Sequence, residues 1–152
     1  MTSLYNLLQF VHVAAAIVWL GGSAALFVLN ARLAGRLDGA GTAALESQSA
    51  RLGALLFGPA AVTTLLAGFG MVAVSGMGAQ LWVIWGLAVV VASLVLSGGF
   101  IRRVAARLGE LTASPDTDAA LVARQRTRLG LLNALNLLLL LSAVWAMVVK
   151  PV

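Results

Sequence analysis

Residues 10–22 read FVHVAAAIVWLGG and decide the fold, because they place the chain's only histidine, His12, inside a long apolar run. No charged residue occurs between residues 4 and 29, and about 20 apolar residues suffice to cross the hydrocarbon layer of a bilayer. This run therefore predicts a membrane-spanning helix over about residues 7–30.

One face of this helix suits the interior of a bundle. Residues three, four and seven apart stack along a helix, so His12, Ala15, Ala16, Trp19 and Ser23 share a face. Small residues allow another backbone to come close, and an imidazole in hydrocarbon needs a polar partner. We expect this face to contact other helices.

The composition excludes an ordinary soluble domain. The chain has 152 residues, of which 61% are hydrophobic and 10% charged, and it has no cysteine. The absence of cysteine excludes disulfides, thiolate metal sites and a cysteine nucleophile. The net charge of +5 comes from basic residues beside the apolar runs, which favours a role in membrane orientation and argues against nucleic acid as a partner.

Three further uncharged segments predict spans over about residues 52–74, 80–101 and 129–149. The run from residue 52 to residue 101 is too long for one crossing, and the glycine-rich turn at residues 75–78 divides it. Ser114, Pro115 and Asp116 predict the start of the last helix. The prediction is one all-α domain over residues 1–152, an integral membrane four-helix bundle with extended cytoplasmic helix ends.

The positive-inside rule predicts the orientation. Three basic residues lie between the first two spans and six between the last two, whereas the turn at residues 75–79 has none and the C-terminus has one. Both termini should then lie outside the cell and both charged connections in the cytoplasm. We expect a multi-pass protein of the bacterial cytoplasmic (inner) membrane.

Two polar layers are expected inside the bundle. Counting about 1.5 Å per helical residue places Ser97, Asn133 and Asn136 towards the cytoplasmic end and His12 in the outer half. Ser93, Ser97, Asn133 and Asn136 are interpreted as interhelical hydrogen-bonding groups that do not touch His12. Two rows of small residues predict helix contacts without naming the partners: Ala60, Thr64 and Gly68, and Ala88 with Ala92.

His12 has two interpretations: a structural histidine with a satisfied ring, or a ligand for haem b or a quinone. A single histidine excludes bis-histidine ligation within one chain. The candidate cofactor-binding residues are His12, Trp19, Met71, Trp85 and Met147, with His12 as the metal ligand. Trp82, Trp85 and Trp145 are otherwise expected to form an aromatic belt at the outer interface.

No catalytic motif is present, which argues against an enzyme, and no carboxylate lies within a span, which argues against a proton pump or transporter. The preferred hypothesis is an accessory or structural subunit that assembles with itself or with a larger membrane complex. The alternative is a haem- or quinone-binding membrane redox protein that uses His12, and a small transporter ranks below both.

Three short segments resemble a known family: HVAAAIVWLGG at residues 12–22, FGP at residues 57–59 and MVVKP at residues 147–151. They are similar to landmarks of a bacterial family of four-span integral membrane proteins of unknown function. The first-span pattern is also similar to copper-resistance D-type proteins and to membrane protoporphyrinogen oxidase-type proteins, where a first-span histidine is tied to metal or haem. That resemblance implies His12 as the matching position, although no second histidine follows it.

Overall fold

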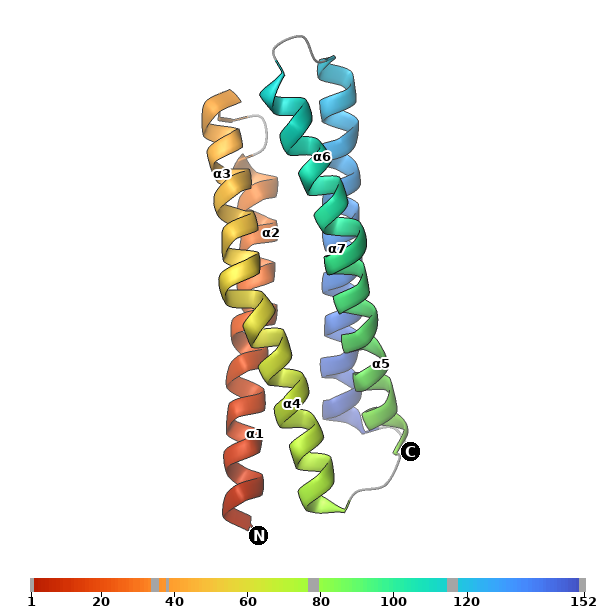
Figure 1. Cartoon of the computed structure of the whole chain (residues 1–152). Coiled ribbons are helices and arrows are strands. Elements are labelled where there is room, and N and C mark those ends of the chain that lie inside the picture. The colour runs from red at the N-terminus through yellow and green to blue at the C-terminus, as the bar shows by residue number, and fades with distance from the viewer. Residues whose placement is uncertain (1, 34–35, 38, 77–79, 115–117, 151–152) are drawn as a thin grey trace.

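A computed structural model describes residues 2–33, 36–37, 39–76, 80–114 and 118–150. Over these residues the protein is all-helical and contains no strand. The chain forms four long rods that lie side by side (Figure 1). Both termini and the α4–α5 connection lie at one end of the molecule, and the other two connections lie at the opposite end.

Three of the rods contain a short π-helical turn. The first consists of α1 (Thr2–Ala16), η1 (Ile17–Gly21) and α2 (Gly22–Leu33). The second consists of α3 (Gly39–Leu52), η2 (Gly53–Phe57) and α4 (Gly58–Ser75), and the third of α5 (Leu81–Val95), η3 (Leu96–Ile101) and α6 (Arg102–Ala113). The fourth is the single helix α7 (Ala119–Val149).

All four rods are long and apolar enough to cross a membrane: Ser3–Leu33, Ala40–Ser75, Leu81–Ala113 and Ala119–Val149. They have 31 to 36 residues each. At about 1.5 Å per residue, helices of this length exceed the thickness of a hydrocarbon layer, which is about 30 Å. The additional length lies in the arginine-containing segments, where the sequence predicted extended helix ends.

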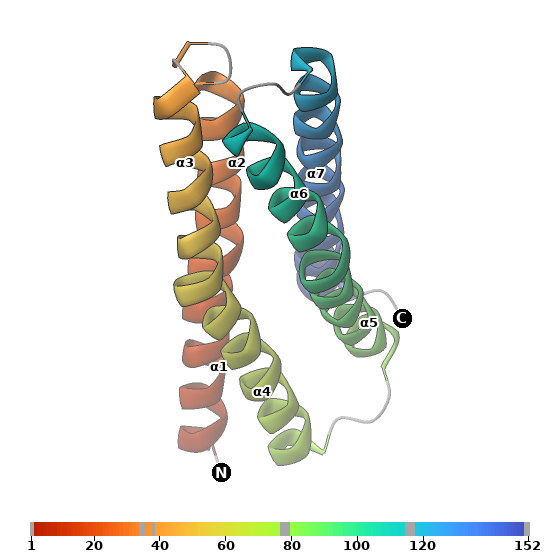
Figure 2. The ribbon, with the colours of Figure 1, turned by 45° about the horizontal axis from the view of Figure 1, so that its top comes forward.

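The bundle is built from two helix pairs. In the half that holds the termini, α1 packs along α4 and α5 packs along α7. In the opposite half α2 contacts α7 and α3, and α6 contacts α7 and α3. Few residues of α4 and α5 meet, and Figure 2 shows these two helices diverging towards the connection between them.

The apolar core lies near the middle of the rods and takes residues from all four. It is formed by Trp19, Ala60, Ala61, Val89, Val90, Leu140 and Ala143. Trp19 is 7% exposed, and Leu20, Phe57, Leu65 and Leu139 pack around the cluster. The predicted inward face of the first helix is thus confirmed at Trp19.

Glycines let side chains of a neighbouring helix come close to the backbone. A Cβ atom at Gly22 would overlap the ring of Phe57, and one at Gly86 would lie 2.7 Å from the Cε of Met147. A side chain at either position would compete for occupied space in a close-packed interior. These two contacts join α2 to η2 and α5 to α7.

The helix boundaries confirm the predicted turn after the second span at Gly76 and correct the predicted start of the last helix. α4 ends at Ser75, and Gly76 follows with φ of 64°, the left-handed conformation that glycine adopts readily. α7 begins at Ala119 rather than at Ser114, because the Asp118 side chain accepts the Ala120 N–H at 2.9 Å and caps the helix. Ser114 has extended backbone after α6, and Pro115 and Asp116 lie outside the described residues.

Pro59 accounts for the position of η2. Proline has no N–H, so it removes one helical hydrogen bond from the turn before it. The backbone N–H of Gly58 bonds to the Gly53 carbonyl, five residues back, which is the π-helical spacing. Proline then occupies the first turn of α4, the position where it is tolerated best.

Candidate functional site around His12

His12 connects the first rod to the second. Its Nδ1 lies 2.8 Å from the main-chain carbonyl oxygen of Thr64. A carbonyl oxygen can only accept a hydrogen bond, so Nδ1 carries the proton and donates it. The lone pair of the neutral ring is then on Nε2, the nitrogen that remains able to accept a hydrogen bond or ligate a metal.

The local sequence of α4 makes this contact feasible. A Cβ atom at Gly68 would lie 3.2 Å from both Cε1 and Nδ1 of His12, so the missing side chain leaves room for the imidazole. A helical carbonyl has a second lone pair beside the one used within its helix, and His12 can therefore bond to Thr64 without breaking α4. The Thr64 hydroxyl donates to the Ala60 carbonyl at 2.8 Å.

The small residues on α4 allow side chains of α1 to approach its backbone. Ala60 and Thr64 are buried, and Gly68 lies against His12. Two residues further along α4, a Cβ atom at Gly70 would lie 3.1 Å from the Cδ1 of Leu8. Thr64 and Gly68 of the predicted row therefore lie at the α1–α4 interface, and Ala60 lies in the central core.

Two other candidate cofactor residues lie near this interface. Met71 follows Gly68 by three residues on α4, about 4.5 Å further along the helix axis, and is half-buried. Trp19 lies two helical turns from His12 along the same rod, in the central core.

Trp85 and Met147 belong to the other helix pair. The indole Nε1 of Trp85 donates to the hydroxyl of Ser142 at 3.3 Å, between α5 and α7. The methyl group of Met147 packs on Gly86, also between α5 and α7. The candidate residues thus divide between the two helix pairs, and both His12 and Trp85 form a hydrogen bond to a neighbouring span.

The second polar layer is a buried hydrogen bond between α5 and α7. The Ser93 hydroxyl donates to Oδ1 of Asn136 at 2.6 Å, and both residues are buried. Asn133 instead donates to the Leu129 carbonyl of its own helix at 3.0 Å. The expected interhelical bond is confirmed for Ser93 and Asn136, in a layer that does not touch His12.

The arginine-rich end contains two contacts that the sequence did not reveal. Asn30 donates to the Leu26 carbonyl at 2.8 Å and to the Ser49 hydroxyl at 3.2 Å, which joins α2 to α3. Arg126 forms an ion pair with Glu46 at 3.0 Å, which joins α7 to α3. Only spacing within one helix is visible in a sequence, and both contacts join different helices.

At the opposite end, tryptophans gather on α5 and α7. A surface hollow of about 150 Å³ is lined by Leu81, Trp82, Trp85, Trp145 and Ala146. The Lys150 ammonium lies 5.6 Å from the centre of the Trp82 ring, a cation–π distance that connects the end of α7 to the start of α5.

Among the described residues, no three histidine, cysteine or acidic side chains are close enough to hold a metal ion. Within that part of the chain, every fully buried side-chain nitrogen or oxygen has a hydrogen-bond partner. Nε2 is the nitrogen through which the His12 ring could hold a cofactor. A backbone carbonyl on the other ring nitrogen is the usual way in which proteins orient a ligating imidazole.

The fold defines a class: an all-helical protein with four helices long and apolar enough to cross a membrane. No family model, no curated protein and no solved structure matches this chain.

Proposed function

We propose that this chain is a small multi-pass protein of the bacterial inner membrane that serves as an accessory or structural subunit, with both termini outside. Its four apolar helices and the distribution of basic residues support this placement. It assembles with a second copy or with another membrane subunit.

One observation carries the assembly proposal: the two rows of small residues have different surroundings. Ala60, Thr64 and Gly68 pack inside the chain, whereas Ala88 and Ala92 on α5 are exposed. Between membrane helices, small residues allow close backbone approach and favour association. The exposed row on α5 is therefore the surface that we assign to a neighbouring transmembrane helix.

Single cysteines test this surface cleanly, because the chain has none of its own. Ala92→Cys should form a disulfide-linked species in native membranes on mild oxidation. Its size would identify a homodimer, and a photoactivatable cross-linker attached to the same cysteine would capture another subunit, which need not carry a cysteine. Ala73→Cys, on an exposed position of α4, is the matched control and should not cross-link. Equal cross-linking of both variants, or of neither, would contradict the proposal.

A second candidate function, binding of haem b or a quinone, is favoured by the 2.8 Å contact between His12 Nδ1 and the Thr64 carbonyl. His12 would hold the group through Nε2, and Met71, three residues after Gly68 on α4, is the candidate side chain that the helix repeat places on the same side of α4 as Gly68. Bound haem would supply one-electron redox chemistry, and the Thr64 carbonyl would fix the orientation of the His12 imidazole.

The absorption spectrum of protein purified from its native host separates the two candidates. Haem b would give a Soret band that His12→Ala shifts or abolishes, whereas Trp85→Phe, in the other helix pair, leaves it unchanged. Colourless protein that releases no quinone into organic solvent would remove the redox function. The cross-linking result alone would then decide the accessory role.

A further inference from the structure

Arginines mark one end of every apolar span. Arg32 follows the first, Arg51 precedes the second, Arg102 and Arg103 follow the third, and Arg128 precedes the fourth. We name these five residues the arginine ring. The uncharged segments 81–101 and 129–149 that end at the ring would measure about 30 Å as helices, the thickness of the hydrocarbon layer.

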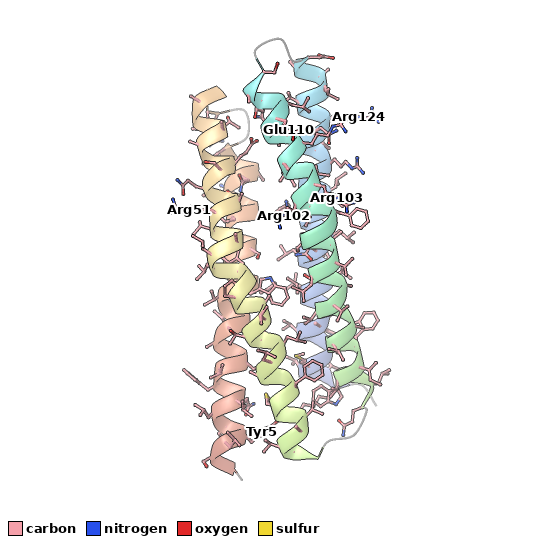
Figure 3. The ribbon with its side chains drawn as sticks, in the orientation of Figure 1. Tyr5, Arg51, Arg102, Arg103, Glu110 and Arg124 are labelled. Atoms are coloured by element: carbon pink, nitrogen blue, oxygen red, sulfur yellow. The ribbon has the colours of Figure 1, made fainter. Side chains whose placement is uncertain are left out.

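Three of the five ring residues share a level along the bundle. Figure 3 shows Arg51, Arg102 and Arg103 at about the same level along the bundle, while Arg124 and Glu110 lie nearer its end. With the apolar segments in hydrocarbon, this level coincides with the phosphate groups of one leaflet.

The packing of α6 keeps its arginines at the surface. Val104 and Leu108 are buried against the bundle, with Leu108 only 1% exposed, so they fix the rotation of this helix. Arg102 and Arg103 are exposed and leave α6 on different sides in Figure 3. All five ring arginines are exposed.

The ring has little negative charge of its own nearby. The chain has five acidic residues, and none lies within four positions of a ring arginine, the reach of an ion pair along one helix. Within the described ranges, the ion pair between helices is that of Glu46 with Arg126, which is outside the ring. Within the described residues, the five positive charges of the ring therefore have no ion-pair partner from the protein.

The residue type favours phosphate. All nine basic residues at this end are arginine, and the one lysine, Lys150, is at the other end. A guanidinium group is planar and can donate two parallel hydrogen bonds to a phosphate, which an ammonium group cannot. Zwitterionic lipids carry a competing cation on the same headgroup, whereas anionic lipids do not.

We propose that the arginine ring binds the phosphate groups of anionic phospholipids, in preference to zwitterionic ones, in the leaflet at this end of the bundle. The inference rests on the proposed membrane placement and is independent of which side of the membrane the ring faces. It is also independent of the cross-linking surface on α5, so the two can fail separately.

Native mass spectrometry of detergent-solubilised protein, titrated with phosphatidylglycerol or phosphatidylcholine of identical acyl chains, tests the ring. The ring variant carries Arg51→Gln, Arg102→Gln and Arg103→Gln. The matched control carries Arg36→Gln, Arg107→Gln and Arg124→Gln, exposed arginines at the same end but outside the ring. Both remove three charges, and helicity and gel filtration check that both variants are folded.

The unmodified protein should bind phosphatidylglycerol at least about tenfold more tightly than phosphatidylcholine, since one basic residue near a membrane surface contributes about fivefold. The ring variant should lose at least about tenfold in affinity for phosphatidylglycerol, and the control less than about threefold. Equal losses in both variants, or equal binding of the two lipids by the unmodified protein, would overturn the proposal.

Inorganic phosphate added in excess distinguishes a lipid site from a soluble-anion site. It should not displace phosphatidylglycerol, because the acyl chains anchor the lipid at the level of the ring. Displacement by inorganic phosphate would overturn the lipid assignment. Unchanged lipid binding by the ring variant, with loss of an acidic protein that copurifies with the unmodified chain, would reassign the ring to protein contact and also overturn it.

Discussion

At the scale of single residues, the interior is held together by a small number of polar contacts in apolar surroundings. His12 donates to a main-chain carbonyl on α4, and Ser93 donates to Asn136 on α7. In hydrocarbon an unpaired polar group costs several kcal/mol, so each contact restricts how two helices can be placed. These bonds add directional constraints on helix depth and rotation to the apolar packing of the core.

Ser93→Ala should destabilise the bundle by about 0.6–2 kcal/mol, because Oδ1 of Asn136 would be left buried without its donor. Unfolding in mixed detergent micelles measures the loss. Ser47→Ala is the control: this serine is exposed and bonds within its own helix, to the Ala44 carbonyl.

A double-mutant cycle distinguishes the bond from general effects of the two side chains. Combining Ser93→Ala with Asn136→Leu removes both partners and should cost less than the sum of the single changes. Strict additivity would show that the 2.6 Å contact does not couple α5 to α7.

Sequence reasoning identified the residue types at this scale and missed several partners. It predicted that Ser93 and Asn136 bond across helices and that His12 lies in a separate layer. It could not predict that His12 bonds to Thr64, because the acceptor is a backbone carbonyl and every residue has one. The absence of a side chain at Gly68 was visible in the sequence, but its neighbour was not.

At the scale of helices, close approach is controlled by glycines at positions where a neighbour's side chain reaches the backbone. Gly21 and Gly22 are adjacent in sequence and have opposite surroundings. A Cβ atom at Gly21 would meet no atom within 4 Å, whereas one at Gly22 would overlap the Phe57 ring. This pair allows the same substitution to be compared in crowded and open space.

Gly22→Ala should destabilise the protein by about 1–3 kcal/mol, because the rigid ring must move as a unit to admit a methyl group. Gly21→Ala should be neutral or slightly stabilising, since alanine favours helix more than glycine does. Thermal unfolding in detergent compares the two variants. Adding Phe57→Leu to Gly22→Ala should recover part of the loss, and failure to recover it would contradict the proposed contact.

The π-helical turns could not be read from the sequence. Hydrophobic periodicity shows that a segment is helical and apolar, but a single turn with different hydrogen bonding does not change composition or charge. Pro59 gave one local signal for η2. Neither η1 nor η3 contains a proline, and their sequences do not distinguish a π turn from a regular α-helix.

At the scale of the whole molecule, charge and hydropathy determined most of the architecture. Four uncharged segments predicted four helices, and all four are long and apolar enough to cross a membrane. The pairing of α1 with α4 and of α5 with α7 was not predictable, because small residues indicate contact without naming the partner. The candidate cofactor residues divide between these two pairs for the same reason.

The orientation has a direct test in cysteine accessibility. Ser75→Cys and Ser114→Cys are near-isosteric changes at exposed positions at opposite ends of the bundle. A membrane-impermeant maleimide should label Ser75→Cys in intact cells and Ser114→Cys only after permeabilisation, as the positive-inside rule requires. The reverse pattern would reject the proposed orientation and leave the four-helix architecture in place.

Each π turn changes which residues of its rod face a given neighbour, because it adds one residue to the regular helical repeat. Hydrogen bonds to the fifth residue instead of the fourth accommodate one additional residue, and each residue turns a helix by about 100°. The same rod therefore presents one side to α4 through α1 and a differently rotated side to α7 and α3 through α2. Deletion of one residue within a π turn would restore the regular repeat along that rod. The rod could then present the correct faces to its neighbours in only one half of the bundle.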